Sequence, residues 1–166
     1  MYKKIVLLAI VLISAMSFAQ ETQKTAHLNY SEVIYAMPEL KQVQDSLKKV
    51  GEIYQAELVA LEDDYNKKFA DLVENQDKLS EAMKIHKNKE LNQLRENSAN
   101  YSQMAQQRLE EMQQTLMAPV IEKLKKAINE VGKENNFLFV VDSSVLHYIS
   151  PAMVDATSLV KKKLGI

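Results

Sequence analysis

The apolar residues between positions 40 and 79 form one narrow stripe with helical spacing. From Val50 to Leu72 they advance by 4, 4 and 3 residues and then by 4, 4 and 3 again, which is an eleven-residue repeat. Such a repeat favours a straight or slightly right-handed helical seam. Because charged and polar residues fill the other positions, this helix can bury only its stripe and must pair with another helix. The stripe comprises Leu40, Val43, Leu47, Val50, Tyr54, Leu58, Leu61, Tyr65, Phe69, Leu72 and Leu79.

A weaker stripe predicts a second long helix from about Ser80 to Val131. Pro119 interrupts this stripe, and a proline at that position is expected to kink or restart the helix. Gly132 follows the last apolar position and is the expected C-terminal cap. The stripe comprises Met83, Leu91, Leu94, Tyr101, Met104 or Ala105, Leu109, Met112, Leu116, Val120, Leu124, Ala127 and Val131.

Two prolines locate the fold-back between these helices. Pro38 suits the first turn of the first helix, where a missing N–H costs no hydrogen bond. If Pro38 and Pro119 mark the same level of two antiparallel helices, the fold-back lies midway, between residues 78 and 79. Ser80 is independently the best N-cap in this region. The sequence therefore predicts a helical hairpin with its tip near 76–82 and arms of about 40 residues, or roughly 60 Å each.

The segment after the second helix predicts β-structure. Residues 137–141 and 145–149 are apolar, aromatic and β-branched runs on either side of a polar turn at 142–144. This pattern is typical of a β-hairpin. A lone hairpin is marginal in water, so it needs further strands to pair with. Within the chain only residues 25–30, which alternate weakly, offer a third strand.

Short helices are expected on both sides of these strands. Ser31 is the expected N-cap of a brief helix that ends near Met37. Asp155 can cap a last helix, which ends in a run of lysines followed by Gly165. The helix dipole stabilises an acidic side chain at the start of a helix and basic side chains at its end.

Three short strands leave a small core with open sheet edges, which proteins normally close off. Pairing across identical chains would remove the edges, so the sequence favours an obligate oligomer. The alternative is a monomer in which a helix covers the sheet edge. The residues expected in the shared β-rich body are Leu28, Phe137, Leu138, Phe139, Val140, Val141, Val145 and Leu146.

The expected fold class is α+β, with a long antiparallel helical hairpin on a small β-rich body. Residues 1–19 are expected to be a signal peptide, and 20–37 the first strand and short helix of the body. Residues 38–118 form the hairpin arm. Residues 119–166 return to the body with a helix, the β-hairpin and the last helix.

The first residues predict export from the cytoplasm. Lys3 and Lys4 precede an apolar run from Ile5 to Ile13, and Ser17 and Ala19 supply the small residues of a cleavage site before Gln20. This arrangement is typical of a secretory signal peptide. A membrane anchor is the alternative, but the apolar run is short for a membrane span.

The charge and composition of the chain argue against several classes of function. Without Lys3 and Lys4 the 21 basic residues fall to 19, against 22 acidic ones, for a formal charge of −3. This charge argues against a nucleic-acid binder, and three glycines cannot build a phosphate-binding loop. The three histidines, His27, His86 and His147, are too far apart in the sequence for a metal-ligand motif. Glu62, Asp63 and Asp64 lie on a predicted helix, where the carboxylates of adjacent residues point in different directions and do not form a paired-carboxylate site. Ser143 and Ser144 are interpreted as turn residues. We expect no enzyme, no metal and no cofactor.

Three stretches together resemble the Skp/OmpH family of periplasmic chaperones. They are "LNYSEVIYAMPELKQVQDSLKK", "APVIEKLKKAINEVGKENNF" and "FLFVVDSSVLHYISPAMVDATSLVKKKL". The resemblance implies a periplasmic homotrimer whose strands form a central barrel. Its three hairpins would enclose a cavity that holds unfolded outer-membrane proteins without ATP. The best-known members are markedly basic, whereas this chain is slightly acidic, which argues against membrane or lipopolysaccharide contact.

The predicted tip carries positive charge above an acidic stem. Residues 52–77 hold eight acidic residues against Lys67 and Lys68. The tip could capture acidic client segments, although charge runs on helices usually serve solubility. The candidate client-binding residues are Lys78, Lys84, His86, Lys87 and Lys89. The alternative function is a structural adaptor that bridges components of the cell envelope.

Overall fold

The computed structural model describes residues 24–166, and the predicted signal peptide lies outside this range. The chain divides into two compact units. The first, here called the β unit, comprises residues 24–33 and 126–166, and the second, the hairpin unit, comprises Ile34–Lys125. The hairpin unit thus extends several residues beyond the predicted 38–118 at each end. No helix within residues 24–166 has an apolar stretch long enough to cross a membrane.

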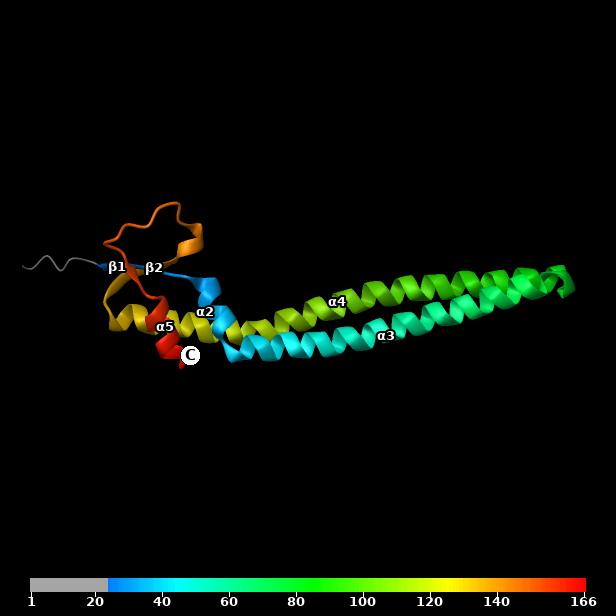
Figure 1. The fold of residues 1–166 in the computed structure, drawn as a ribbon, viewed down its shortest axis with the longest axis horizontal. Coiled ribbons are helices and arrows are strands. Elements are labelled where there is room, and N and C mark those ends of the chain that lie inside the picture. Colours follow the sequence, from blue (N-terminus) through cyan, green and yellow to red (C-terminus); the bar gives the residue numbers. More distant parts are fainter. Residues whose placement is uncertain (1–23) are drawn as a thin grey trace, which may run out of the picture. The chain divides into compact units, whose positions relative to one another are not determined.

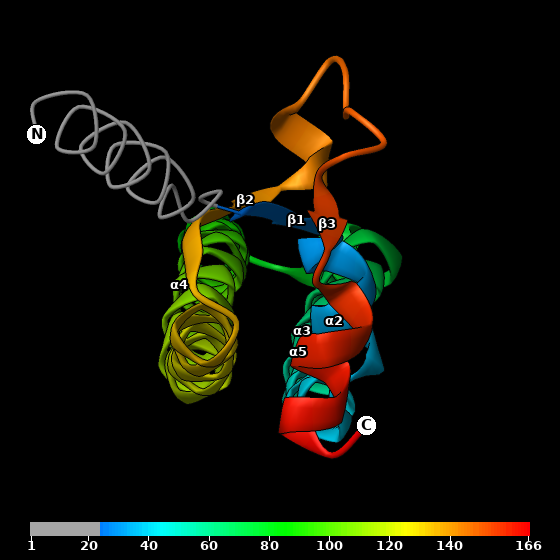
Figure 2. The same cartoon turned by 90° about the vertical axis from the view of Figure 1, so that its left-hand side faces the viewer.

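Two helices run side by side and antiparallel in the hairpin unit (Figures 1 and 2). Helix α3 spans Pro38–Asn75, and α4 begins at Glu81 and continues to Glu134. Pro38 occupies the first turn of α3, as its missing N–H predicts. The chain reverses through a 3-10 turn, η1 (Gln76–Lys78), which lies within the predicted tip. The Ser80 hydroxyl accepts a hydrogen bond from the Met83 N–H at 3.4 Å and caps α4.

The apolar stripes form the seam of this hairpin, with two exceptions. Near the middle, the Tyr54 and Tyr101 rings meet edge to face with centroids 6.0 Å apart. Phe69 was expected in the seam but is 48% exposed, and Met83 is 48% exposed as well. The Phe69 ring instead lies parallel to that of Tyr65, at a centroid distance of 6.1 Å. The fully packed seam positions are Leu40, Val43, Leu72, Leu91, Ala105, Val120 and Leu124.

Helix α4 does not restart at Pro119. The residue lies inside one continuous helix and is exposed. Its missing N–H leaves the Thr115 carbonyl without a helical partner, and water can hydrate that carbonyl because Thr115 is exposed too. The helix tolerates proline where solvent can replace the lost hydrogen bond.

The end of α4 also differs from the prediction. Gly132 does not cap the helix, which continues to Glu134. Asn136 takes the left-handed conformation instead, with φ of 53°, and its N–H donates to the Lys133 carbonyl at 3.3 Å. Asparagine tolerates this conformation better than most residues, so it replaces glycine as the stop signal.

The β unit holds a three-stranded parallel sheet. Strand β1 (Lys24–Leu28) lies at its centre, with β2 (Phe137–Asp142) on one edge and β3 (Val154–Asp155) on the other (Figure 2). The predicted antiparallel β-hairpin is therefore wrong. Residues 143–145 form a 3-10 turn, η2, and residues 146–149 form no strand. The chain instead crosses to the far edge of β1, where Ala26 aligns with Val154 and His27 with Asp155.

One face of this sheet carries the core of the β unit. Along β1, Ala26 and Leu28 are buried, while His27 between them is half-buried. The remaining core residues come from the short helix after β1, from the last turns of α4, and from helix α5 (Thr157–Leu164) with the residue that precedes it. They are Val33, Ala127, Val131, Ala156 and Val160. The core is small and consists mainly of short side chains.

Hydrogen bonds fix the short helices of the β unit. Asp155 Oδ1 accepts from the Thr157 N–H at 2.9 Å, as expected for the start of α5. Gly165 ends α5 in the left-handed conformation, with φ of 77°. Helix α2 (Tyr30–Ala36) is capped by Asn29 rather than by Ser31, because Asn29 Oδ1 accepts from the Glu32 N–H at 3.0 Å.

Candidate interaction surfaces

Apolar side chains of the β unit remain uncovered within one chain. Strand β2 is an edge strand, and on it Leu138 is 58% and Phe139 48% exposed. Val145 and Tyr148, in the irregular segment after β2, are 71% and 77% exposed. An apolar edge strand of this kind offers unpaired backbone groups to another strand. We call Leu138, Phe139, Val145 and Tyr148 the assembly surface.

The structure separates the predicted assembly residues into three groups, of which Leu138, Phe139 and Val145 form the exposed one. Leu28 is buried in the core of its own chain, so it has little surface left for a partner. Phe137, Val140, Val141 and Leu146 are half-buried. Tyr148 is the exposed residue that sequence reasoning missed, because the segment was read as a paired strand.

The candidate client-binding residues near the tip differ in whether they already form an ion pair with a carboxylate of the chain. Lys87 forms an ion pair with Asp71 at 2.5 Å, and Lys84 pairs with Glu81 at 2.9 Å. Lys78 and Lys89 pair with no carboxylate of residues 24–166, and both are exposed, as is His86. Two of the five candidate residues are thus already neutralised by their own chain.

Ion pairs also connect the two helices of the hairpin. Lys68 lies between Asp64, at 3.9 Å, and Glu90 on the opposite helix. The hydrogen bond from Lys68 lowers the pKa of Glu90 and, in turn, the bond to Glu90 raises the pKa of Lys68. In the same way the hydrogen bond from Lys87 lowers the pKa of Asp71.

These pairs could have been found from the sequence. Lys68 with Glu90, and Asp71 with Lys87, are symmetric about residue 79. The predicted fold-back lies at almost the same position. Opposite charges at equal distances from a fold-back are the signal that identifies such pairs.

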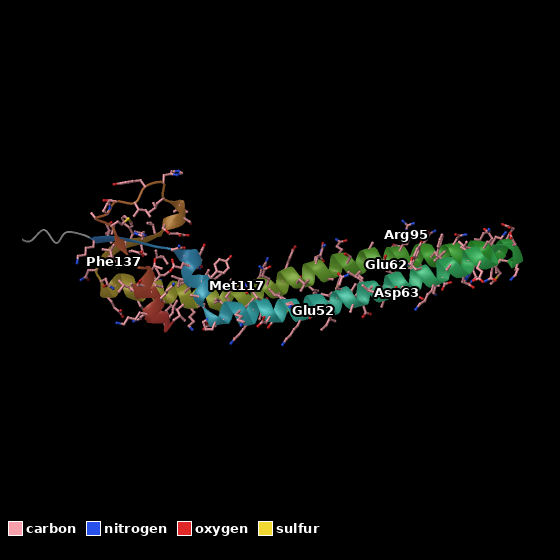
Figure 3. All side chains as sticks on the ribbon, viewed as in Figure 1. Glu52, Glu62, Asp63, Arg95, Met117 and Phe137 are labelled. Carbon is pink, nitrogen blue, oxygen red and sulfur yellow. The ribbon has the colours of Figure 1, made fainter. Side chains whose placement is uncertain are left out.

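A groove of about 520 Å³ follows the seam in the middle of the hairpin. Its charged lining residues, Glu62 on α3 and Arg95 on α4, have opposite signs (Figure 3). Helix α3 contributes Leu58, Leu61, Glu62, Tyr65 and Asn66, and α4 contributes Leu94, Arg95, Ser98, Ala99 and Ser102. The groove was not expected from the sequence, because the periodic stripe suggested a filled seam.

The other candidates for chemistry remain apart. Among residues 24–166 no three His, Asp or Glu side chains come together as a metal site. His27 lies in β1, His86 in α4 and His147 in the segment between β2 and β3. Of the acidic cluster on α3, Glu62 lines the groove whereas Asp64 lies near Lys68.

The fold and its surfaces define an α+β protein of Skp-like architecture, with a long helical hairpin and a small parallel sheet. The family model described as "Outer membrane protein (OmpH-like)" matches residues 24–164. The chain therefore belongs to the OmpH-like family, and the resemblance seen in the sequence is confirmed.

A solved structure shares this fold. It comes from Caulobacter crescentus CB15 and is described as a candidate outer membrane chaperone (OmpH-like). The TM-score is 0.75 at 17% sequence identity, and the similarity covers 88% of this chain and 86% of the Caulobacter chain. None of the curated proteins compared with the chain matches it. At this identity the likeness to the Caulobacter structure concerns the fold alone.

Proposed function

We propose that the protein is an ATP-independent holdase chaperone of the periplasm. It binds unfolded outer-membrane proteins and keeps them soluble for delivery to the outer membrane. Membership of the OmpH-like family over residues 24–164 carries this proposal. The description of the Caulobacter neighbour as a candidate outer membrane chaperone supports it.

The hairpin unit has surface properties that suit such a role. Large apolar side chains are exposed along both helices rather than gathered in one deep pocket, and they are Ile53, Val59, Phe69, Val73, Met83, Ile85 and Met104. Scattered apolar contacts are individually weak, but several of them together hold a long unfolded chain firmly. Methionine adapts to clients of different shape. Release then follows when the client folds elsewhere, and no nucleotide is required.

The chaperone acts as a homotrimer assembled through the β unit. The exposed apolar residues of the assembly surface and the free edge of β2 support this assembly. Pairing of β2 with a strand of another copy satisfies its backbone groups and buries Leu138 and Phe139. The formal charge of −3 after signal cleavage supports the absence of nucleic-acid or anionic-lipid partners.

Aggregation of unfolded outer-membrane barrel proteins tests the proposal. Several such proteins are diluted from urea into buffer with and without the purified chain, and light scattering is followed with and without ATP. We expect suppression of scattering for all clients, independent of ATP. Binding to one folded envelope protein, with no effect on scattering, would identify a structural adaptor instead.

A further inference from the structure

In the half of the hairpin nearer the tip, the two sides differ in the charge of their side chains. Successive residues of an α-helix are turned by about 100°, so Asp64, Lys68 and Asp71 lie on one side of the line through Tyr65. The ion pairs between the helices, which join Lys68 to Glu90 and Asp71 to Lys87, lie on that side. It is therefore a charged side.

The opposite side is nearly free of net charge. Here the groove is lined by Asn66, Ser98 and Ser102 among its polar residues, and its two charges, Glu62 and Arg95, cancel. Uncharged amide and hydroxyl groups can bond to both the N–H and the C=O of a peptide backbone. This side therefore offers hydrogen bonds without selecting for either sign of charge.

The groove continues toward the tip as an apolar line. Phe69 follows Tyr65 by four residues and Val73 follows Phe69 by four, so the three side chains are neighbours on one helix face. Tyr65 lines the groove and its ring lies parallel to the Phe69 ring. Phe69 and Val73 are 48% and 52% exposed, although the seam beside them is packed. The line from Leu58 to Val73 is about 22 Å long.

We propose that this line, from Leu58 to Val73 with the groove beside it, is the site that binds one extended, uncharged segment of an unfolded barrel strand. The inference rests on the proposed function and names the client segment that the hairpin selects. A transmembrane β-strand alternates apolar with polar residues and carries little charge on its lipid-facing side. Its apolar residues pack along the line while its unpaired backbone bonds to Asn66, Ser98 and Ser102. About seven extended residues fill 22 Å, which is most of a barrel strand of about 9–11 residues.

Matched aspartate substitutions test this site. Phe69→Asp and Ala99→Asp place a charge on the uncharged side, whereas Ala60→Asp places the same charge at an exposed position on the side of Asp71. The probe is a fluorescent peptide of about ten residues that alternates valine with serine or threonine. We expect the Kd of this peptide to rise about tenfold in each groove variant and to change less than about twofold in the control, because the bound segment excludes water from the new charge. Circular dichroism establishes that the three variants keep the helix content of the wild type.

A crosslinking experiment gives a second readout. A photoreactive benzoylphenylalanine at position 69 should crosslink to the peptide, and the same group at position 60 should not. Equal effects of the groove and control variants, or equal crosslinking at both positions, would overturn the inference. If Phe69→Asp dissociates the oligomer, the line is an interface between copies and the inference is also wrong. These outcomes leave the proposed function standing, provided that the wild type still suppresses aggregation of unfolded barrel proteins.

Discussion

A single hydroxyl group joins the last helix to the first strand. The Thr157 side chain is buried, and its Oγ1 accepts a hydrogen bond at 3.0 Å from the N–H of Asn29, just after β1. Thr157→Val keeps the shape but leaves that N–H without its partner. We expect a loss of about 1–3 kcal/mol in the free energy of unfolding, measured in urea, with Thr157→Ser close to the wild type. A valine variant as stable as the wild type would show that water reaches the Asn29 N–H.

The same corner makes the β unit sensitive to acid. Hydrogen bonds from the Thr157 hydroxyl and from its backbone N–H lower the pKa of Asp155 below its ordinary value of 3.8. Because the pKa is lowered in the folded state, Asp155 contributes stability above pH 4, and this contribution is lost as the pH falls through the lowered value. Asp155→Asn removes the titrating group but keeps an acceptor oxygen. We expect its unfolding free energy to fall less steeply below pH 4 than that of the wild type, and an equal slope would contradict this role.

A substitution at Phe139 can test assembly of the proposed trimer without disturbing the fold of the single chain. It is 48% exposed in the single chain, so Phe139→Asp does not bury a charge within its own β unit. In the proposed trimer the aspartate would lie in a closed apolar interface, where an unpaired charge costs several kcal/mol. We expect sedimentation to show a monomer with nearly unchanged circular dichroism, and Ile53→Asp on the hairpin to remain oligomeric. A Phe139→Asp variant that stays trimeric would exclude β2 from the interface.

At the level of elements, the helical hairpin was predictable because its signals are local. The repeat from Val50 to Leu72, the proline at position 38 and the N-cap at Ser80 each act within a few residues, and together they located α3, α4 and the tip. Phe69 was misplaced because periodicity assigns every apolar residue of the right phase to the seam. The actual pairing leaves its ring beside Tyr65 instead.

The sheet was less predictable because strand pairing is not local. Residues 145–149 have the composition of a strand, yet β1 has only two edges, and β2 and residues 154–155 occupy them. No pattern within residues 137–149 shows whether a second apolar run pairs within its chain or remains exposed. The groove on the hairpin was missed for a similar reason, since its volume depends on how Ser98 and Ala99 meet the opposite helix.

The eleven-residue repeat permits a direct test of the hairpin unit. Removing 56–66 from α3 and 91–101 from α4 takes out one repeat from each helix and preserves the phase of both seams. We expect circular dichroism to lose helix in proportion to the 22 residues removed, while sedimentation still shows the proposed trimer. The control removes 56–66 alone, which shifts the part of α3 before the deletion against α4 and separates Tyr54 from Tyr101. Dissociation after the matched deletion would mean that the hairpin, and not the β unit, holds the copies together.

At the level of the whole molecule, the distribution of charge leads to a prediction about how a client would first meet the protein. The chain carries a formal charge of −1, and the candidate client-binding residues near the tip form a group of basic side chains in which Lys84 and Lys87 are already paired with carboxylates. Lys84 and Lys87 are poor choices for testing this group, because their substitution would break ion pairs with Glu81 and Asp71. Lys78 and Lys89 are exposed and pair with no carboxylate of the described chain, so their substitution changes the local field without breaking an ion pair.

The double substitution Lys78→Glu and Lys89→Glu therefore tests electrostatic capture at the tip. Each exposed charge contributes about 1 kcal/mol or less, so we expect slower association of an unfolded barrel protein with an acidic segment and little change in its dissociation. The effect should shrink in added salt, because exposed charges are screened over about 8–10 Å near physiological ionic strength. Stopped-flow binding at two salt concentrations measures both rates, and Lys41→Glu with Lys49→Glu, on α3 far from the tip, is the control with the same change of net charge. If both double variants slow association equally, overall charge and not the tip governs the encounter. If neither variant slows association at low salt, capture depends on the apolar contacts of the hairpin alone.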